Sequence, residues 1–201
     1  MKRLLFPALL LSACAATPAP DPTPNVVLDT EAGEIEIEVY PDAAPLSAGD
    51  FLRYVDDGLY DGEAFYRTVR ADNDPRGMNM SLIQGGRRDQ EPVHPPVAHE
   101  RTTDTGISNT RGAVALARLE PGTGSAAWFF INIGDNSFLD TGGARNPDGE
   151  GYATFGRVVR GMDVVETIQA GRSEAPSDEA VTSGQILDEP VTITRAYRVA
   201  E

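Results

Sequence analysis

A single arginine lies inside an otherwise uncharged stretch, Ala64–Val69, whose sequence Ala-Phe-Tyr-Arg-Thr-Val predicts a β-strand. A guanidinium in an apolar strand is costly unless its five N–H donors find acceptors. For an isolated arginine, the ordinary explanation is a structural ion pair. Arg67 is not isolated, because a second predicted strand, residues 82–84 (Leu-Ile-Gln), follows after a polar loop, ends in two glycines and brings the amide of Gln84.

Aromatic residues gather in three stretches further along the chain. These are residues 128–132 (Trp-Phe-Phe-Ile-Asn), 138–140 (Phe-Leu-Asp) and 152–156 (Tyr-Ala-Thr-Phe-Gly). If the fold brings them to Arg67 and Gln84, they form an apolar pocket with one fixed cation and one amide at its rim. Such a pocket would hold an apolar group against a charged donor.

These motifs, in this order, resemble the cyclophilin family of peptidyl-prolyl cis–trans isomerases. The family pattern has a Phe-His-Arg strand, a Gln-Gly-Gly, a Gln-Phe-Phe-Ile strand, an aromatic-Leu-Asp, and a His or Tyr shortly before Phe-Gly. The chain matches this pattern from about residue 26 to residue 199. The resemblance implies a mainly β fold, a closed eight-stranded antiparallel β-barrel capped by two α-helices, and activity on proline-containing polypeptides.

Isomerisation of an X–Pro bond needs no covalent chemistry. The bond rotates over a barrier of about 18–20 kcal/mol because the nitrogen lone pair is delocalised into the carbonyl group. A catalyst has to favour the twisted state, in which the lone pair is localised on nitrogen, and a permanently charged donor directed at that nitrogen does so. Arginine suits this role because it stays protonated. We therefore assign the catalytic role to Arg67 and expect no cofactor and no metal ion.

By the same resemblance, the substrate-binding residues divide into a proline pocket and a peptide groove. Gln84 would orient Arg67 or bind the substrate backbone, and Phe65 would support Arg67. The expected substrate-binding residues are Phe65, Leu82, Gln84, Ala117, Arg118, Trp128, Phe130, Phe138, Leu139 and Tyr152. Those expected to hold the proline ring are Leu82, Phe130, Leu139 and Tyr152, and those expected in the groove include Ala117 and Arg118.

Two positions depart from the family pattern. Trp128 stands where the family has Gln, and either Met80 or Ser81 stands where the pocket has Phe. An indole has one N–H donor and no acceptor, so it could bond a substrate carbonyl but not a substrate N–H. We expect Trp128 to narrow the pocket rather than close it. The departures leave a second function open, a proline-peptide-binding or chaperone module with little or no catalytic activity.

The N-terminus has the pattern of a bacterial lipoprotein signal. Residues 1–13 begin with a basic pair and continue with an apolar run far shorter than the roughly 20 residues needed to span a bilayer. Residues 11–14 (Leu-Ser-Ala-Cys) resemble the lipobox, which implies cleavage before Cys14 and acylation of its thiol. Ordinary cleavage after Ala15 is the alternative. We expect a periplasmic protein with a lipid anchor on Cys14, in the outer membrane because Ala15 rather than Asp follows the cysteine.

The remaining residues divide into a tether and one domain. Residues 14–25 carry Cys14 and are rich in Pro and Ala, which predicts an extended linker. Residues 26–201 form the cyclophilin-like domain. Within it, helices are expected at 45–57 and 162–169, a closing strand at 191–199, and long polar loops at 70–80 and 170–189.

Composition and charge exclude several other functions. The 201 residues carry a formal net charge of −14 at pH 7, which argues against binding nucleic acid, or an anionic membrane through the protein surface. Cys14 is the only cysteine and Lys2 the only lysine, so the domain has no disulfide and no lysine chemistry. His94 and His99 are interpreted as loop residues because two prolines between them break any helix that would align them as metal ligands. We expect a monomer whose partners are proline-containing client polypeptides.

Overall fold

The fold begins with a hairpin whose residues alternate between apolar and polar. In the computed structural model, which describes residues 24–88, 90–118 and 122–199, β1 (Asn25–Thr30) pairs antiparallel with β2 (Gly33–Val39). Ile35, Ile37 and Val39 are fully buried, whereas the glutamates between them are more exposed. Successive side chains of a strand point to opposite faces, so the alternation places one face of the hairpin on the core.

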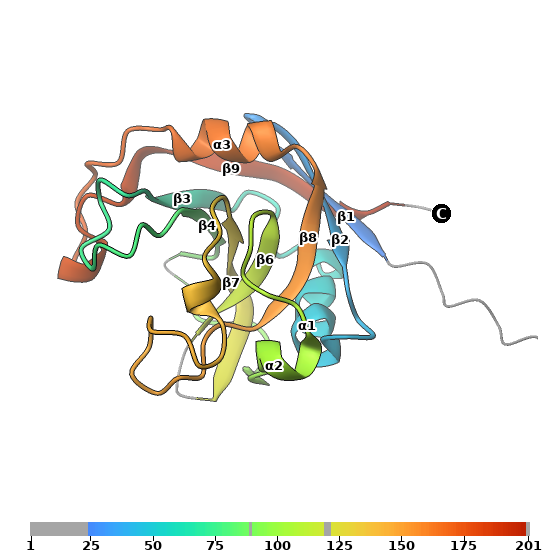
Figure 1. Ribbon diagram of the computed structural model, residues 1–201. Helices are drawn as coiled ribbons and strands as arrows, with labels where there is room; N and C mark the ends of the chain where they lie inside the picture. The colour runs from blue at the N-terminus through green and yellow to red at the C-terminus, as the bar shows by residue number, and fades with distance from the viewer. Residues whose placement is uncertain (1–23, 89, 119–121, 200–201) are drawn as a thin grey trace, which may run out of the picture.

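Eight strands close into an antiparallel β-barrel (Figure 1). Their order is β4-β3-β9-β1-β2-β8-β6-β7, and a pairing between β4 and β7 joins the two ends. The strands after the first hairpin are β3 (Ala64–Val69), β4 (Leu82–Gly86), β5 (Val97–Ala98), β6 (Ala113–Arg118), β7 (Thr123–Asn132), β8 (Thr154–Arg160) and β9 (Ile186–Arg198). The short β5 pairs only with β7, outside this ring. The closed barrel expected from the sequence is confirmed.

Closure of the barrel depends on two glycines at the end of β4. Gly86 has φ = +111°, and a side-chain carbon there would lie 2.2 Å from the backbone oxygen of Ala127 on β7. A carbon added at Gly85 would lie 2.7 Å from the ring of Phe65. Only glycine permits such an approach. Gly86 is therefore required where β4 joins β7, and Gly85 where β4 passes Phe65 of β3.

Two helices cover the barrel, as expected (Figure 1). α1 (Pro45–Asp56) begins at a proline, which is favoured at the first helical position, and it packs against β7, β8 and β9. α3 (Met162–Gln169) packs against β2, β3 and β4. Shorter elements lie in the loops: α2 (Thr102–Thr105) and the 3-10 helices η1 (Ser137–Leu139) and η2 (Ala180–Thr182). Among the described residues, no helix is long and apolar enough to cross a membrane.

Apolar side chains form two clusters, and neighbouring residues of β7 contribute to different ones. Phe129 belongs to the barrel core, where its ring centroid lies 5.6 Å from that of Phe51 and 5.7 Å from that of Phe65. Phe130 belongs to a second cluster that also contains Val69, Met80, Leu82, Ala115 and Leu139. Because adjacent side chains of a strand point to opposite faces, one Phe-Phe pair stabilises the barrel and also supplies a surface outside it.

The closing strand differs from the sequence-based prediction. β9 begins at Ile186, within the range predicted as a polar loop, so that loop ends at Gln185. The register of β9 against β3 jumps from Val191 to Ile186, and the residues between them, which include Pro190, bulge out of the ladder. Proline and acidic residues favoured the loop prediction, but a bulge accommodates them without ending the strand.

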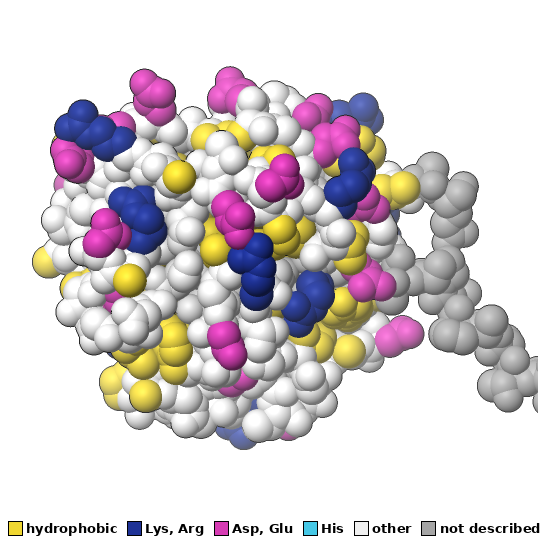
Figure 2. Space-filling view, turned by 45° about the horizontal axis from the view of Figure 1, so that its top comes forward, with side chains coloured by type: hydrophobic (Ala, Val, Ile, Leu, Met, Phe, Trp, Pro, Cys, Tyr) yellow, Lys and Arg dark blue, Asp and Glu magenta, His cyan; other side chains and the backbone are white. Residues whose placement is uncertain are grey.

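Charged side chains of both signs are interspersed on the face shown in Figure 2, without a continuous basic patch. Several arginines pair with carboxylates, such as Arg160, which lies 3.1 Å from Glu34 and 2.9 Å from Glu36. Exposed pairs of this kind contribute little to stability. Most surface arginines therefore have a carboxylate partner, unlike Arg67 and Arg145 of the site described below.

Both histidines make local contacts. His94 lies 2.9 Å from Asp57, and a ring nitrogen of His99 lies 2.8 Å from the backbone oxygen of Glu150. The described ranges contain no group of His, Cys, Asp and Glu that could hold a metal ion. Residues 1–23 lie outside the described residues, so the signal segment (1–13), the lipidated Cys14 and the tether (14–25) stay predictions.

Candidate active site

Arg67 is held by the amides of two glutamines from distant parts of the chain. Its strand neighbour across the β3–β4 ladder is Gln84, whose Oε1 accepts a hydrogen bond from Arg67 Nη1 at 2.7 Å. Gln185, immediately before β9, accepts from Nε at 2.9 Å and from Nη2 at 2.6 Å. Each glutamine is fixed in turn, because Gln84 Nε2 donates to the hydroxyl of Tyr66 and Gln185 Nε2 to the backbone oxygen of Asn73, both at 2.8 Å. The guanidinium therefore has a defined orientation.

The charge of Arg67 is not neutralised by a carboxylate. Within the described part of the chain, Arg67 makes no ion pair, so the ordinary explanation of a structural salt bridge does not hold. Burial lowers the pKa of Arg67, the hydroxyls of Tyr66 and Tyr152 oppose that shift, and the charge of Arg145 adds to it. A guanidinium nevertheless stays protonated in proteins. The site thus contains a fixed cation with neutral hydrogen-bond partners.

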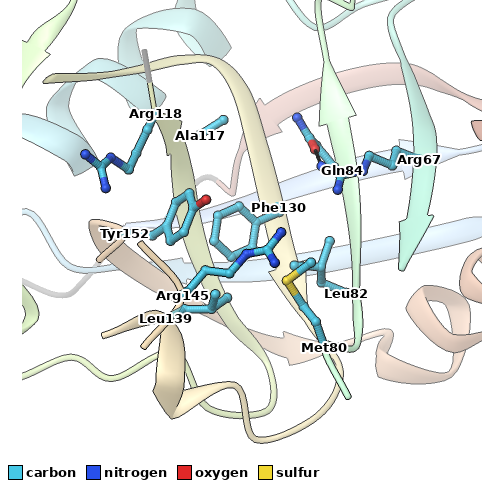
Figure 3. A pocket seen from close by; sticks show the side chains of 10 residues that line it. All are labelled: Arg67, Met80, Leu82, Gln84, Ala117, Arg118, Phe130, Leu139, Arg145 and Tyr152. Carbon is cyan, nitrogen blue, oxygen red and sulfur yellow. Dashed lines mark hydrogen bonds between the residues drawn. The ribbon is translucent and has the colours of Figure 1, made fainter. Parts of the chain in front are cut away.

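A cavity of about 180 Å³, lined by both apolar and charged side chains, lies beside this cation (Figure 3). It is lined by Arg67, Met80, Leu82, Gln84, Ala117, Arg118, Phe130, Leu139, Arg145 and Tyr152. In Figure 3, Phe130 lies at the centre, with Leu82 and Met80 on one side and Leu139 and Tyr152 on the other. The rings of Phe130 and Tyr152 meet edge to face, 5.3 Å apart at 86°. The fold therefore brings together the four residues that the sequence suggested would hold a proline ring.

Two of the expected substrate-binding residues line neither the cavity nor the groove next to it. Phe65 is fully buried in the barrel core against Phe129, because its side chain points to the opposite face of the sheet from the site. Phe138 is half-buried and packs against the second apolar cluster from outside. Direct contact of Phe65 with a substrate is thus contradicted, and Phe138 acts on the cavity only through its neighbours.

Trp128 borders a neighbouring groove rather than the cavity itself. The groove is also lined by Tyr66, Arg67, Gln84, Arg88, Ala117, Arg118, Ser177, Asp178, Glu179, Thr182 and Ile186. The indole N–H of Trp128 donates to the backbone oxygen of Arg87 at 2.8 Å. In this conformation the donor is already used, so a hydrogen bond from the indole N–H to a substrate carbonyl would require Trp128 to release Arg87. That Trp128 narrows the groove and favours small residues before proline stays a prediction.

Of Met80 and Ser81, the two residues that could replace the family's phenylalanine, only Met80 lines the cavity. Met80 is buried in the cavity wall, whereas the hydroxyl of Ser81 accepts a hydrogen bond from Gln169 at 2.9 Å. Asp74 organises the preceding loop by accepting backbone N–H groups at Arg76, Met78 and Met80. Burial alone would raise the pKa of Asp74, but these three hydrogen bonds lower it below its usual value. The 70–80 loop is thus part of the cavity wall and not only a surface excursion.

Arg118 fixes the 140–151 loop above the cavity. Its guanidinium pairs with Asp148, donates to the backbone oxygen of Gly151 at 3.3 Å, and lies 5.9 Å from the ring centre of Tyr152. The hydrogen bond from Arg118 and another from the backbone N–H of Glu150 lower the pKa of Asp148 to about 2. At the base of the loop, Asp140 accepts from the backbone N–H of Asn109 at 2.8 Å.

Sequence reasoning missed two residues of the site, Gln185 and Arg145. Gln185 lies in a stretch that reads as a loop, and nothing in its neighbours indicates a partner 118 positions away in the sequence. Arg145 lies in a Gly-rich loop between two recognised motifs. An alternation test applied to residues 186–198 could have extended β9 toward Gln185. No sequence signal identifies Arg145.

A closed barrel that presents a fixed arginine beside a cavity with apolar side chains is the arrangement expected of an isomerase that binds a proline ring. The model of the family described as cyclophilin-type peptidyl-prolyl cis–trans isomerase matches residues 25–197, and the chain belongs to this family. Peptidyl-prolyl cis–trans isomerase A of Dickeya dadantii is 36% identical over 180 residues, covering 86% of this chain and 87% of the relative. Peptidyl-prolyl cis–trans isomerase B of Escherichia coli is 35% identical over 176 residues, covering 84% and 99%.

A solved structure shows the same fold. The cyclophilin-type isomerase of Cryptosporidium parvum, determined in the presence of the dipeptide Ala-Pro, superposes with a TM-score of 0.65 at 18% identity, over 88% of this chain and 99% of that one. The family, the fold and the class of activity expected from the sequence are therefore confirmed. The roles of individual residues are proposals, which the next subsection develops.

Proposed function

We propose that this protein accelerates X–Pro isomerisation in proline-containing client polypeptides of the bacterial cell envelope, with Arg67 as its catalytic residue. The main observation behind the proposal is that the uncompensated cation of Arg67 lies beside the apolar side chains of Leu82, Phe130 and Leu139 in one cavity. Three of the five N–H donors of Arg67 bind Gln84 and Gln185, which leaves one on each terminal nitrogen for a substrate. The proline ring would occupy the cavity, and its nitrogen would face these donors.

The contribution of Arg67 to the rate can be given a range. A charge-assisted hydrogen bond contributes about 1.5–3 kcal/mol, which corresponds to roughly a tenfold to 150-fold effect on a rate. The remaining acceleration must come from holding the proline ring in place while the preceding residue rotates. Leu82, Phe130, Leu139 and Tyr152, which line the cavity, are assigned this second role.

The alternative function is a module that binds proline-containing peptides with little turnover. Two observations favour it: Trp128 lines the groove next to Arg67, and the side chain of Arg145 extends into the cavity. Both functions need the same cavity, so binding alone cannot distinguish them. The discriminating quantity is the rate of cis–trans exchange per enzyme molecule.

We expect the purified full-length protein, in detergent where it carries lipid, to accelerate exchange of an Ala-Ala-Pro-Gln peptide at substoichiometric concentration. The measurement is NMR exchange spectroscopy, which follows the cis and trans signals without a coupled protease. Uncatalysed exchange takes tens to hundreds of seconds, so catalysis is visible above a low background. Peptide signals that shift in proportion to the protein, without faster exchange, would favour the binding module and contradict the proposed catalysis.

The cellular location is proposed from the N-terminal sequence. A lipobox ending at Cys14, followed by a Pro- and Ala-rich tether, would attach the domain to the periplasmic side of the outer membrane. In a Gram-negative host, we expect the full-length protein to fractionate with outer membranes and to incorporate labelled fatty acid. Cys14→Ser should abolish the label and either release the protein or leave its signal uncleaved. Soluble, unlabelled wild-type protein would contradict the lipid anchor and leave the proposed chemistry unaffected.

A further inference from the structure

Arg145 extends into the proline cavity from the 140–151 loop. Figure 3 shows its side chain directed from that loop toward Phe130 and Met80, and all three residues line the same cavity. The backbone of Arg145 is held on both sides: its N–H donates to the oxygen of Phe138 at 3.3 Å, and its carbonyl accepts from the guanidinium of Arg76. The position of the side chain is therefore set by the fold of two loops.

The guanidinium of Arg145 has a buried donor without a partner. Its Nη1 is shielded from solvent and makes no hydrogen bond, and within the described ranges no carboxylate lies within ion-pair distance. Arg118, on the same cavity wall, is by contrast paired with Asp148. A buried donor left unpaired is unfavourable and rare in native structures. Because the side chain of Arg145 lines the cavity, a ligand that enters the cavity could supply the acceptor.

The net positive charge of the cavity indicates which kind of ligand group would accept a hydrogen bond from Arg145. Three arginines line the cavity and no acidic residue does, so once Arg118 is paired with Asp148 the charges of Arg67 and Arg145 remain. These two cations are close enough for Arg145 to lower the pKa of Arg67. A carboxylate matches a guanidinium in both charge and geometry, because its two oxygens accept parallel N–H bonds. A neutral amide oxygen would satisfy the donor but leave the repulsion between the cations.

We propose that Arg145 determines specificity by favouring clients that carry a carboxylate next to the proline. The carboxylate comes from an Asp or Glu side chain adjoining the proline, or from the α-carboxylate of a chain that ends in proline. This inference rests on the proposed function of the cavity as a proline site. It does not follow from the overall charge of the protein, which at −14 would repel acidic clients at long range.

The test compares five peptides of matched length by NMR titration and exchange. Three have the forms Ala-Pro-Glu, Ala-Pro-Gln and Glu-Pro-Ala with blocked ends, and two end in proline as a free acid or an amide. For wild-type protein, we expect a carboxylate peptide to bind about tenfold more tightly than its neutral counterpart, as charge-assisted bonding implies. The peptide that shows the difference identifies the source of the carboxylate.

Two substitutions separate recognition from general charge effects. Arg145→Gln should reduce the ratio of the two dissociation constants to near one, and Arg145→Lys should retain part of it because the charge remains without the planar fork. Arg195→Gln is the matched control, since it removes one exposed arginine from the far end of β9, beside Tyr197, and should leave the ratio unchanged.

Two outcomes would overturn the inference, and a third would overturn the proposed catalysis while the inference stands. Equal dissociation constants for all five peptides in the wild type would overturn it. A uniform rise in kcat/KM for every peptide in Arg145→Gln would also overturn it, because it would show that Arg145 only obstructs the cavity. If no peptide is isomerised but the ratio of dissociation constants persists, the catalytic proposal fails and the specificity of Arg145 stands.

Discussion

Arg67→Ala is expected to lower kcat/KM for X–Pro isomerisation by at least about tenfold, within the tenfold to 150-fold range that one charge-assisted hydrogen bond implies. The reason is that the N–H donors left over from Gln84 and Gln185 are the only charged donors we assign to the proline nitrogen. KM should change less than kcat, because the donors act mainly in the twisted state. Exchange spectroscopy on the Ala-Ala-Pro-Gln peptide provides the measurement.

Arg67→Lys tests whether the positive charge alone is sufficient, without the planar guanidinium. A lysine keeps the charge but has no planar fork, so it cannot bond Gln84 and Gln185 simultaneously and still face the substrate. We expect it to restore only a small part of the activity. Thermal unfolding should show that both variants remain folded. A folded Arg67→Ala protein with wild-type kcat/KM would remove Arg67 from the mechanism and leave ring confinement as the source of catalysis.

Gln185→Glu is expected to lower kcat by about tenfold or more while the protein stays folded. The substitution keeps an acceptor for Nε and Nη2 of Arg67, both of which donate to Gln185 now. It removes the Nε2 donor that bonds the backbone oxygen of Asn73, and it places a negative charge against the guanidinium, at hydrogen-bond distance and largely away from water. The developing lone pair of the proline nitrogen would then meet a neutralised cation.

Gln185→Met separates orientation from charge. It has a similar length and no acceptor, so Arg67 would lose one of its two amide partners and keep its full charge. We expect kcat to fall less than in Gln185→Glu, because only the orientation of the guanidinium becomes less defined. Both variants are compared by kcat and KM from NMR exchange. Activity in Gln185→Glu equal to that of the wild type would show that the uncompensated charge of Arg67 is unimportant.

The sequence by itself determined the barrel and most of the proline cavity. Alternation in β2 predicted which residues are buried, and helix periodicity predicted α1 and α3 to within a residue at each end. Such patterns are local, because a strand repeats every two residues and a helix every 3.6. Motif order then identified Leu82, Phe130, Leu139 and Tyr152, whose backbone neighbours fix where they point.

Only the tertiary structure decided which face of a strand serves the site. Phe65 and Phe130 are both apolar residues within recognised motifs, yet the first lies in the barrel core and the second in the cavity. The bulge between Phe65 and Arg67 changes the pairing register at that point, so alternation counted along the sequence does not predict orientation across it. A single extra residue in a strand exchanges the two faces.

Contacts between residues far apart in the sequence likewise decided which groups surround the charged side chains of the site. Gln185 reaches Arg67 because the bulge at Pro190 extends β9 through a segment whose composition is that of a loop. Arg145 reaches the cavity because Arg118 and Arg76 hold its loop in place from other parts of the chain. Sequence patterns predict the secondary structure of a segment and the face of the strand or helix on which a residue lies. Which neutral or charged groups surround a buried cation depends on segments that meet only when the barrel closes.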